Sequence, residues 1–228
     1  MTDTKLAMPE FSRVDKDPLH ERVYNELRAA LMTGQLVPGQ SVTVRALADA
    51  FGTSAMPVRE ALRRLAAEQA LQILPNRSVI VPRMTREKIE DLCSVRVVVE
   101  GMAAERAAAH ITAAELDRLA TLLDEMCANA KFGGMRGYLG QNQDFHFTIY
   151  GAARSPVLLP IIESLWLQIG PLLTLLNEDR EISEYFAEKH HTDALEALRA
   201  GDGAAARAAI ANDISEAADY LLELSGPG

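Results

Sequence analysis

The chain has 228 residues, of which 48% are hydrophobic and 24% charged, a composition that excludes a disordered or low-complexity protein. Two cysteines, Cys93 and Cys127, form no Cys-x-x-Cys motif, so we expect neither a disulfide framework nor a thiolate metal site. The N-terminus does not resemble a signal peptide, and no run of about 18 uninterrupted apolar residues occurs. The sequence therefore predicts a cytoplasmic protein with no membrane partner.

The net charge of -9 is distributed unevenly along the chain. Residues 1–83 contain 11 Lys and Arg against 9 Asp and Glu, whereas residues 84–228 contain 12 against 23. An even spread of this acidity would argue against a nucleic-acid partner. Within residues 40–83, however, six arginines stand against three carboxylates. The pattern predicts a local basic surface on an acidic protein.

The first third of the chain predicts a flexible arm over residues 1–17, followed by three short helices and a hairpin. Apolar residues at helical spacing predict a first helix over 19–33, which ends at a glycine. Thr43 caps a second helix over 43–51, and Thr53 or Ser54 caps a third that reaches about residue 69. Two β-prone runs within residues 71–81 flank a turn and predict a small hairpin.

The second and third helices are joined by Gly52-Thr53-Ser54 and followed at once by the hairpin, which is typical of a winged helix-turn-helix. A helix in the major groove places its first residues at the base edges, while flanking arginines and free helix N–H groups contact phosphates. A basic but merely solvated helical surface is the alternative. The candidate DNA-binding residues lie on both helices and at the hairpin tip: Arg45, Ser54, Arg59, Arg63 and Arg77.

From Thr85 onward the pattern is helical throughout, with short connections between apolar stripes. We expect six helices, over residues 86–110, 112–130, 135–152, 155–177, 182–200 and 202–224. Such a series predicts an antiparallel helical bundle. The predicted fold class is mainly α, with a winged helix-turn-helix domain over 18–83 and an all-helical domain over 84–228.

Three of the predicted bundle helices carry metal-ligating residue types. Asn142 and His146 are four residues apart and share a helix face, while His191 and Asp213 lie in two later helices. Imidazole and carboxylate groups bind zinc, nickel or manganese, and a bundle core can bring facing helices together. Histidines buried without a metal are the alternative. We expect the neighbouring His190 to face solvent.

Arg96 and Glu100 are four residues apart, which by itself predicts an ordinary exposed ion pair. Valines crowd the same helix and indicate that part of it is buried, and a buried arginine needs an anionic partner. Arg96 is therefore a candidate for binding an anionic ligand. Weaker candidates for the same pocket, each expected to be an ordinary core or surface residue, are Tyr138, Trp166 and Asn177.

Residues 23–82 resemble the DNA-binding domain of the GntR family of bacterial transcription regulators. The motifs that carry the resemblance are Gly34-Gln-Leu-Val-Pro38-Gly39, Leu47-Ala48, Pro57-Val58-Arg59-Glu60-Ala61-Leu62 and Pro75-Asn76-Arg77. The chain departs from the family at Ala55, where arginine is usual, and at Ser78, where glycine is usual. The resemblance implies binding to a pseudo-palindromic double-stranded operator as a homodimer, with an altered sequence preference.

Residues 89–220 are similar to the effector-binding domain of the FCD subgroup of that family. The motifs are Arg96-Val-Val-Val-Glu100, Asn142-x-x-Phe145-His146 and His191 ahead of Leu195-Glu196-Ala197-Leu198. The resemblance implies that Arg96 faces a small carboxylate effector and that Asn142, His146 and His191 hold a divalent metal. Asp213 replaces the last histidine of the family, which makes manganese or nickel better suited to the site than zinc.

Two other functions fit parts of this pattern. A metal-dependent helical-bundle enzyme is one, but the chain has no duplicated Glu-x-x-His, no His-Glu-x-x-His and no Gly-x-Ser-x-Gly motif. A DNA-binding module whose bundle only dimerises is the other. We expect a transcription regulator that is not an enzyme.

Overall fold

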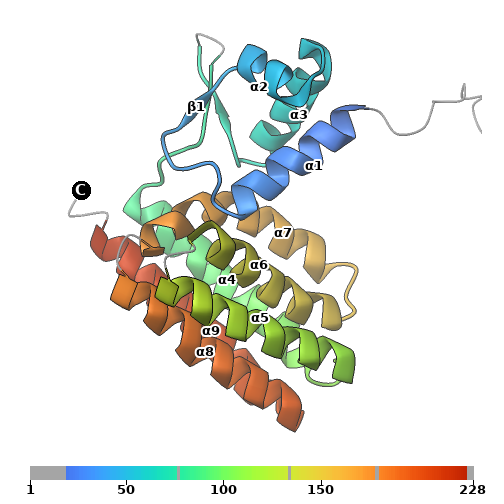
Figure 1. Ribbon diagram of the computed structural model, residues 1–228, viewed down its shortest axis with the longest axis vertical. Coiled ribbons are helices and arrows are strands. Elements are labelled where there is room, and N and C mark those ends of the chain that lie inside the picture. The colour runs from blue at the N-terminus through green and yellow to red at the C-terminus, as the bar shows by residue number, and fades with distance from the viewer. Residues whose placement is uncertain (1–18, 76–77, 133–134, 178–179, 225–228) are drawn as a thin grey trace, which may run out of the picture.

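The computed structural model describes residues 19–75, 78–132, 135–177 and 180–224. A small N-terminal unit of three helices and a sheet sits on one end of a larger helical bundle (Figure 1). The helices of the N-terminal unit are α1 (Leu19–Met32), α2 (Val44–Phe51) and α3 (Ala55–Ala67). The prediction of a mainly α fold is confirmed.

Local signals in the sequence fix the ends of the short helices. The side chain of Thr43 accepts a hydrogen bond from the Ala46 amide at the start of α2, as predicted. Gly52 ends that helix with φ of 61°, a left-handed conformation that glycine adopts without strain. Ser54 occupies the N-cap position of α3, but its side chain makes no capping hydrogen bond.

A three-stranded antiparallel sheet lies beside these helices, in the order β1-β3-β2. The predicted hairpin is confirmed as β2 (Gln72–Ile73) paired with β3 (Val79–Ile80). Strand β1 (Ser41–Val42) was not predicted, because two residues are too few to show the alternation that identifies a strand. β1 pairs with β3 with Ser41 opposite Ile80, so it ties the start of α2 to the hairpin.

Six α-helices and one 3-10 helix make up the described part of the bundle. They are α4 (Arg86–Ala107), α5 (Ala113–Phe132), α6 (Met135–Ala152), α7 (Leu158–Ile169), η1 (Gly170–Asn177), α8 (Arg180–Ala200) and α9 (Gly203–Leu224). The predicted capping box is present, since the amides of Thr112 and Glu115 each donate to the other residue's side chain. Helix α9 packs against both α4 and α8.

The helix predicted over residues 155–177 is in fact two elements, α7 and the 3-10 helix η1. Pro171 lacks a backbone N–H, so a regular helix cannot continue through the Gly170–Pro171 junction unchanged. By length and composition alone, Leu158–Leu176 could cross a membrane, but half of its apolar window is buried inside the protein. Ile162 and Trp166 are at most 1% exposed, which identifies this segment as a core element of the bundle.

The end of α1 packs directly on α7 and η1, so the two parts of the molecule touch through backbone. A Cβ added at Gly170 would lie 2.6 Å from the carbonyl oxygen of Leu31. A Cβ at Gly34 would lie 2.6 Å from Thr174 Cγ2 and 2.8 Å from Leu139 Cδ1. At Gly170 the neighbouring atoms are backbone, which leaves no room for a Cβ and places the start of η1 directly against the end of α1.

Candidate DNA-binding surface and candidate metal centre

Three arginines on α2 and α3 are exposed and without a protein partner. Within the described ranges, Arg45, Arg59 and Arg63 form no ion pair and no side-chain hydrogen bond. Arg64 differs, because it pairs with Glu21 at 3.0 Å and lies 3.7 Å from the centre of the Tyr24 ring. The unpaired arginines leave positive charge available to an external anion. Arg77, also predicted to contact DNA, lies outside the described residues.

The first turn of α3 is open to a ligand. Ser54 is exposed, and its hydroxyl makes no capping hydrogen bond. The first backbone N–H groups of α3 therefore receive no hydrogen-bond acceptor from the Ser54 side chain. Ala55 is half-buried at the position where the GntR resemblance leads one to expect arginine. Free N–H groups at a helix start favour a phosphate oxygen.

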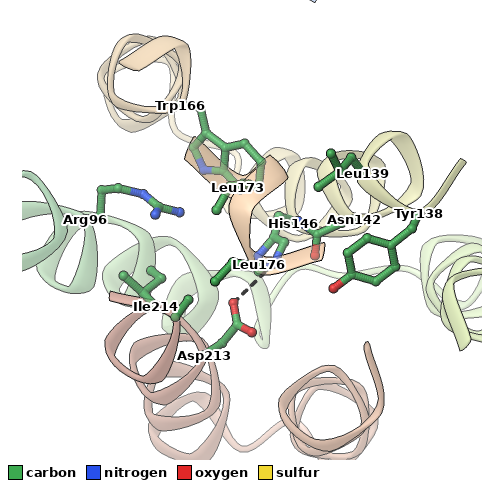
Figure 2. Close-up of a pocket in the computed structure, with 11 residues that line it drawn as sticks. Arg96, Tyr138, Leu139, Asn142, His146, Trp166, Leu173, Leu176, Asp213 and Ile214 are labelled. Atoms are coloured by element: carbon green, nitrogen blue, oxygen red, sulfur yellow. Dashed lines mark ion pairs between the residues drawn. The ribbon is translucent and has the colours of Figure 1, made fainter. Parts of the chain in front are cut away.

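A small, partly enclosed cavity of about 30 Å³ lies in the bundle between α4, α6, α7, η1 and α9 (Figure 2). This volume accommodates about two water-sized groups. The residues that line it mix polar and apolar side chains: Arg96, Tyr138, Leu139, Asn142, His146, Trp166, Leu173, Leu176, Asp213, Ile214 and Ala217. The bundle therefore encloses a small polar chamber with apolar walls.

The structure brings the four predicted metal ligands together from α6, α8 and α9. One ligand atom from each of His146, His191 and Asp213 lies within 4.8 Å of the others. Asn142 joins them, because its Oδ1 lies 2.9 Å from Nε2 of His191. Both histidines are 2% exposed, and the side chain of Asp213 is 15% exposed. Figure 2 shows the carboxylate of Asp213 and the imidazole of His146 facing each other across the cavity.

These residues fit a divalent cation. Burial lowers the pKa of His146 well below its usual value, so the ring stays neutral and can offer a nitrogen lone pair. Nε2 of His146 lies 3.4 Å from Oδ2 of Asp213, which is longer than an ordinary hydrogen bond. Burial also raises the pKa of Asp213, as expected for a carboxylate without a close cation. A cation among two imidazoles, an amide and a carboxylate would satisfy all four groups.

The Arg96–Glu100 pair is buried, as the crowded valines indicated. Arg96 Nε donates to Glu100 Oε1 at 2.6 Å, and the two residues are 4% and 0% exposed. Burial alone would lower the pKa of Arg96, but the adjacent Glu100 carboxylate raises it instead. Val95 and Val98 are 42% and 50% exposed, so the valines themselves form the outer face of α4. Arg96 therefore remains charged at the wall of the cavity.

The expectation about His190 is wrong. His190 does not face solvent: it is 2% exposed, and its Nε2 lies 2.9 Å from Oε2 of Glu216 on α9. Tyr138 and Trp166 are buried core residues, as expected, and both line the cavity for which they were weaker candidates. The side chain of Asn177 is not among those described.

Three further residues, not among the predicted site residues, lie at the chamber or behind its wall. Tyr150 donates to Glu100 and contacts Nδ1 of His146, and its position four residues after His146 on α6 is a helical-face signal that could have identified it. Leu173 and Leu176 form the wall provided by η1. No local pattern identifies them, because an apolar residue facing a cavity looks like any core residue.

Comparisons with known proteins follow the same division of the chain. The family described as "Bacterial regulatory proteins, gntR family" matches residues 19–81, and the FCD domain matches residues 91–216. The HTH-type transcriptional regulator McbR of Escherichia coli K12 is 32% identical over 207 residues, covering 90% of this chain and 93% of McbR. The HTH-type transcriptional repressor RspR of the same strain is 22% identical over 207 residues, covering 91% and 90%.

Solved structures agree with this similarity. The structure described as E. coli McbR/YncC matches with a TM-score of 0.84 and 29% identity, covering 91% of this chain and 99% of that one. A GntR regulator from Rhodococcus sp. RHA1, 23% identical, shares the fold with a TM-score of 0.74 over 90% of this chain and 97% of its own.

Proposed function

This chain belongs to the GntR family of bacterial transcription regulators and carries an FCD domain, and we propose that it works in the cytoplasm as a ligand-responsive homodimer on operator DNA. Both matching families consist of regulators, so the expectation that the protein is not an enzyme is confirmed and the metal-dependent enzyme is excluded. One observation carries the proposal: unpaired exposed arginines and a small polar chamber in the bundle occur in the same chain.

We place the DNA-binding domain at residues 18–83, after an arm over 1–17, and the sensor domain at 84–228. Helix α3 enters the major groove, with Arg59 directed at base edges and Arg63 at the flanking backbone. Arg45, Arg77 and the Ser54 end of α3 contact phosphates or the minor groove. The sensor domain holds the acidity of the chain, so phosphate repulsion restricts DNA contact to the N-terminal unit.

We assign the homodimer contact to the outer face of α4. Val95, Val98 and Met102 share one side of this helix and are 42%, 50% and 39% exposed. A second copy of the chain on this face would bury them, and a two-fold axis there presents two α3 helices to the two halves of a pseudo-palindrome. Analytical ultracentrifugation should find a dimer that V98E converts to a monomer. A wild-type monomer, or a V98E dimer, would contradict this assignment.

We assign Asn142, His146, His191 and Asp213 to a divalent cation, with manganese or nickel favoured over zinc by the two oxygen ligands. When bound, the metal supplies positive charge that attracts a carboxylate. Arg96 supplies a second positive centre at the cavity wall, so a small organic acid with one carboxylate between them is the effector class. Metal analysis of protein purified without a chelator should find about one equivalent per chain, and D213A should lose it.

The size of the chamber suggests how ligand binding reaches the DNA. A space for about two waters cannot hold a metal and an organic acid together, so the effector must displace a wall. Helix η1 is the wall best suited to move, since 3-10 hydrogen bonds are poorer than those of an α-helix. It carries Leu173 and Leu176 on the cavity side and Gly170 against α1. Effector binding would thereby change the surface of the bundle on which the DNA-binding domain packs.

The test measures operator binding and effector binding in one assay. An operator selected from random duplexes should bind wild-type protein with a steep salt dependence. Small carboxylates, screened with Mn²⁺, should change that affinity, and DNA should change the carboxylate affinity by the same factor. Operator binding that no carboxylate alters would favour the module whose bundle only dimerises. Absence of sequence-specific DNA binding would overturn the proposal.

A further inference from the structure

We propose that Tyr150 is a positioning residue that fixes the proton of His146 on Nδ1, so that Nε2 is free to bind a divalent cation. The inference rests on the proposed function, because it concerns the metal centre assigned above. Tyr150 is 1% exposed, lies one helical turn after His146 in α6, and is not itself a ligand. Its hydroxyl lies 3.0 Å from Nδ1 of His146.

A count of protons determines the direction of this hydrogen bond. A phenol has a single proton, and Tyr150 donates it to Oε2 of Glu100 at 2.6 Å. The hydroxyl oxygen must then accept from Nδ1 of His146, so Nδ1 carries the hydrogen. A neutral imidazole with its proton on Nδ1 has a lone pair on Nε2. That nitrogen faces Asp213 and the cavity.

Glu100 prevents the hydroxyl from turning the other way. Its oxygens accept from Arg96 at 2.6 and 3.2 Å and from Trp166 Nε1 at 2.9 Å, in addition to Tyr150. All of these partners donate to Glu100, and a carboxylate paired with an arginine accepts hydrogen bonds without donating any. The Tyr150 proton therefore has a fixed destination.

The ring of His146 is also held in place by its neighbours. His191 and Trp166 pack with their ring centres 5.1 and 5.4 Å from that of His146. In the part of the chain that the structure describes, Tyr150 is the hydrogen-bond partner recorded for Nδ1. Packing thus fixes where the ring lies, while Tyr150 determines which nitrogen can bind a metal. A buried second partner of this kind is a common feature of histidine ligands.

The same carboxylate supports both halves of the proposed ligand site. Glu100 orients Arg96, which faces the effector, and through Tyr150 it orients His146, which faces the metal. The two positive centres therefore share a single anchor in the core. A change at Tyr150 should weaken the metal side while it leaves the Arg96–Glu100 pair intact.

The experiment compares two tyrosine-to-phenylalanine variants of the full-length protein. Y150F removes only the hydroxyl, and a competition titration with Mn²⁺ should find affinity reduced about 10–100-fold. Y24F is the matched control, because Tyr24 is also buried and also donates to a glutamate, Glu68, but has no histidine behind it. Y24F should keep wild-type Mn²⁺ affinity. Equal affinities of Y150F and wild type would overturn the role of Tyr150.

A second measurement separates positioning from a merely structural effect. Long-range ¹H–¹⁵N correlation spectra of metal-free wild-type protein should place the His146 proton on Nδ1, and those of Y150F should contain the Nε2–H form as well. A wild-type ring protonated on Nε2 would overturn the inference even if Y150F failed to fold. If wild-type protein bound no divalent metal, both the proposed metal centre and this inference would be wrong. That result differs from equal Mn²⁺ affinities of Y150F and wild type, which would contradict the role of Tyr150 alone.

Discussion

The two parts of the molecule use charged side chains in opposite ways. In the N-terminal unit, Arg45, Arg59 and Arg63 are exposed and without a protein partner among the described residues. In the bundle, Arg96 and Glu100 are buried and bonded to each other. Under the proposed function, exposed charge is left for a large polyanion outside the fold, whereas buried charge must first be satisfied within the fold before it can serve a ligand.

The largest effect is expected for the buried Arg96–Glu100 pair. E100Q removes the charge that balances Arg96 and should lower the free energy of unfolding by about 3–5 kcal/mol, because the arginine is left buried and unpaired. Urea denaturation of the metal-free protein measures it. The control is E105Q on the same helix, whose exposed partner Arg207 lies 2.9 Å away and which should cost less than about 1 kcal/mol. Equal losses would contradict the contrast between buried and exposed pairs.

The role of the exposed arginines in the N-terminal unit is tested by R59A. Loss of this side chain should weaken binding to the selected operator by about 1–3 kcal/mol and relax the preference at one base pair, without a change in thermal stability. Fluorescence anisotropy with operator and scrambled duplexes measures both effects. R64A should weaken binding less, because Arg64 is already paired with Glu21 and Glu68. Undiminished specificity in R59A would show that α3 is not the helix that recognises the bases.

The contact between the two units is tested by G170A. A methyl group there would lie 2.6 Å from a backbone carbonyl of α1, so the units must separate slightly, at a cost of about 1–3 kcal/mol. Mn²⁺ binding should persist, while the effect of carboxylates on operator affinity should fall. G140A is the matched control, since no atom lies within 4 Å of the Cβ it would add. Wild-type coupling in G170A would mean that the signal takes another route.

The smallest effect is expected at the ion pair that joins α1 to α7. Arg28 and Glu163 lie 2.7 Å apart with 24% and 32% of their side chains exposed. E163Q should therefore lower stability by about 0–1 kcal/mol, and less at high salt. Urea melts at two ionic strengths measure it. A larger loss of stability that does not depend on salt would mean that this pair behaves like a buried ion pair.

The sequence predicted most of what is local in this protein. Helix caps such as Thr43 and the Thr112 capping box depend on residues a few positions apart, and the Asn142–His146 spacing identifies a shared helix face. Strand β1 was missed because two residues are too few to show the alternation of a strand, and η1 was predicted as the end of one longer helix because an apolar 3-10 segment has no distinct sequence pattern. The meeting of Asp213 with His146 was predicted only through the family resemblance. Burial of His190 required the packing of α8 on α9.

The buried metal ligands of the chamber have a kinetic consequence. They are at most 15% exposed, and η1 forms one wall of the chamber, so we expect local opening of the bundle to limit the exchange of a cation or an acid with solvent. Such openings limit association and dissociation alike, and local rearrangements of this kind take microseconds to seconds. A bound cation would then outlast brief depletion of free metal in the cell.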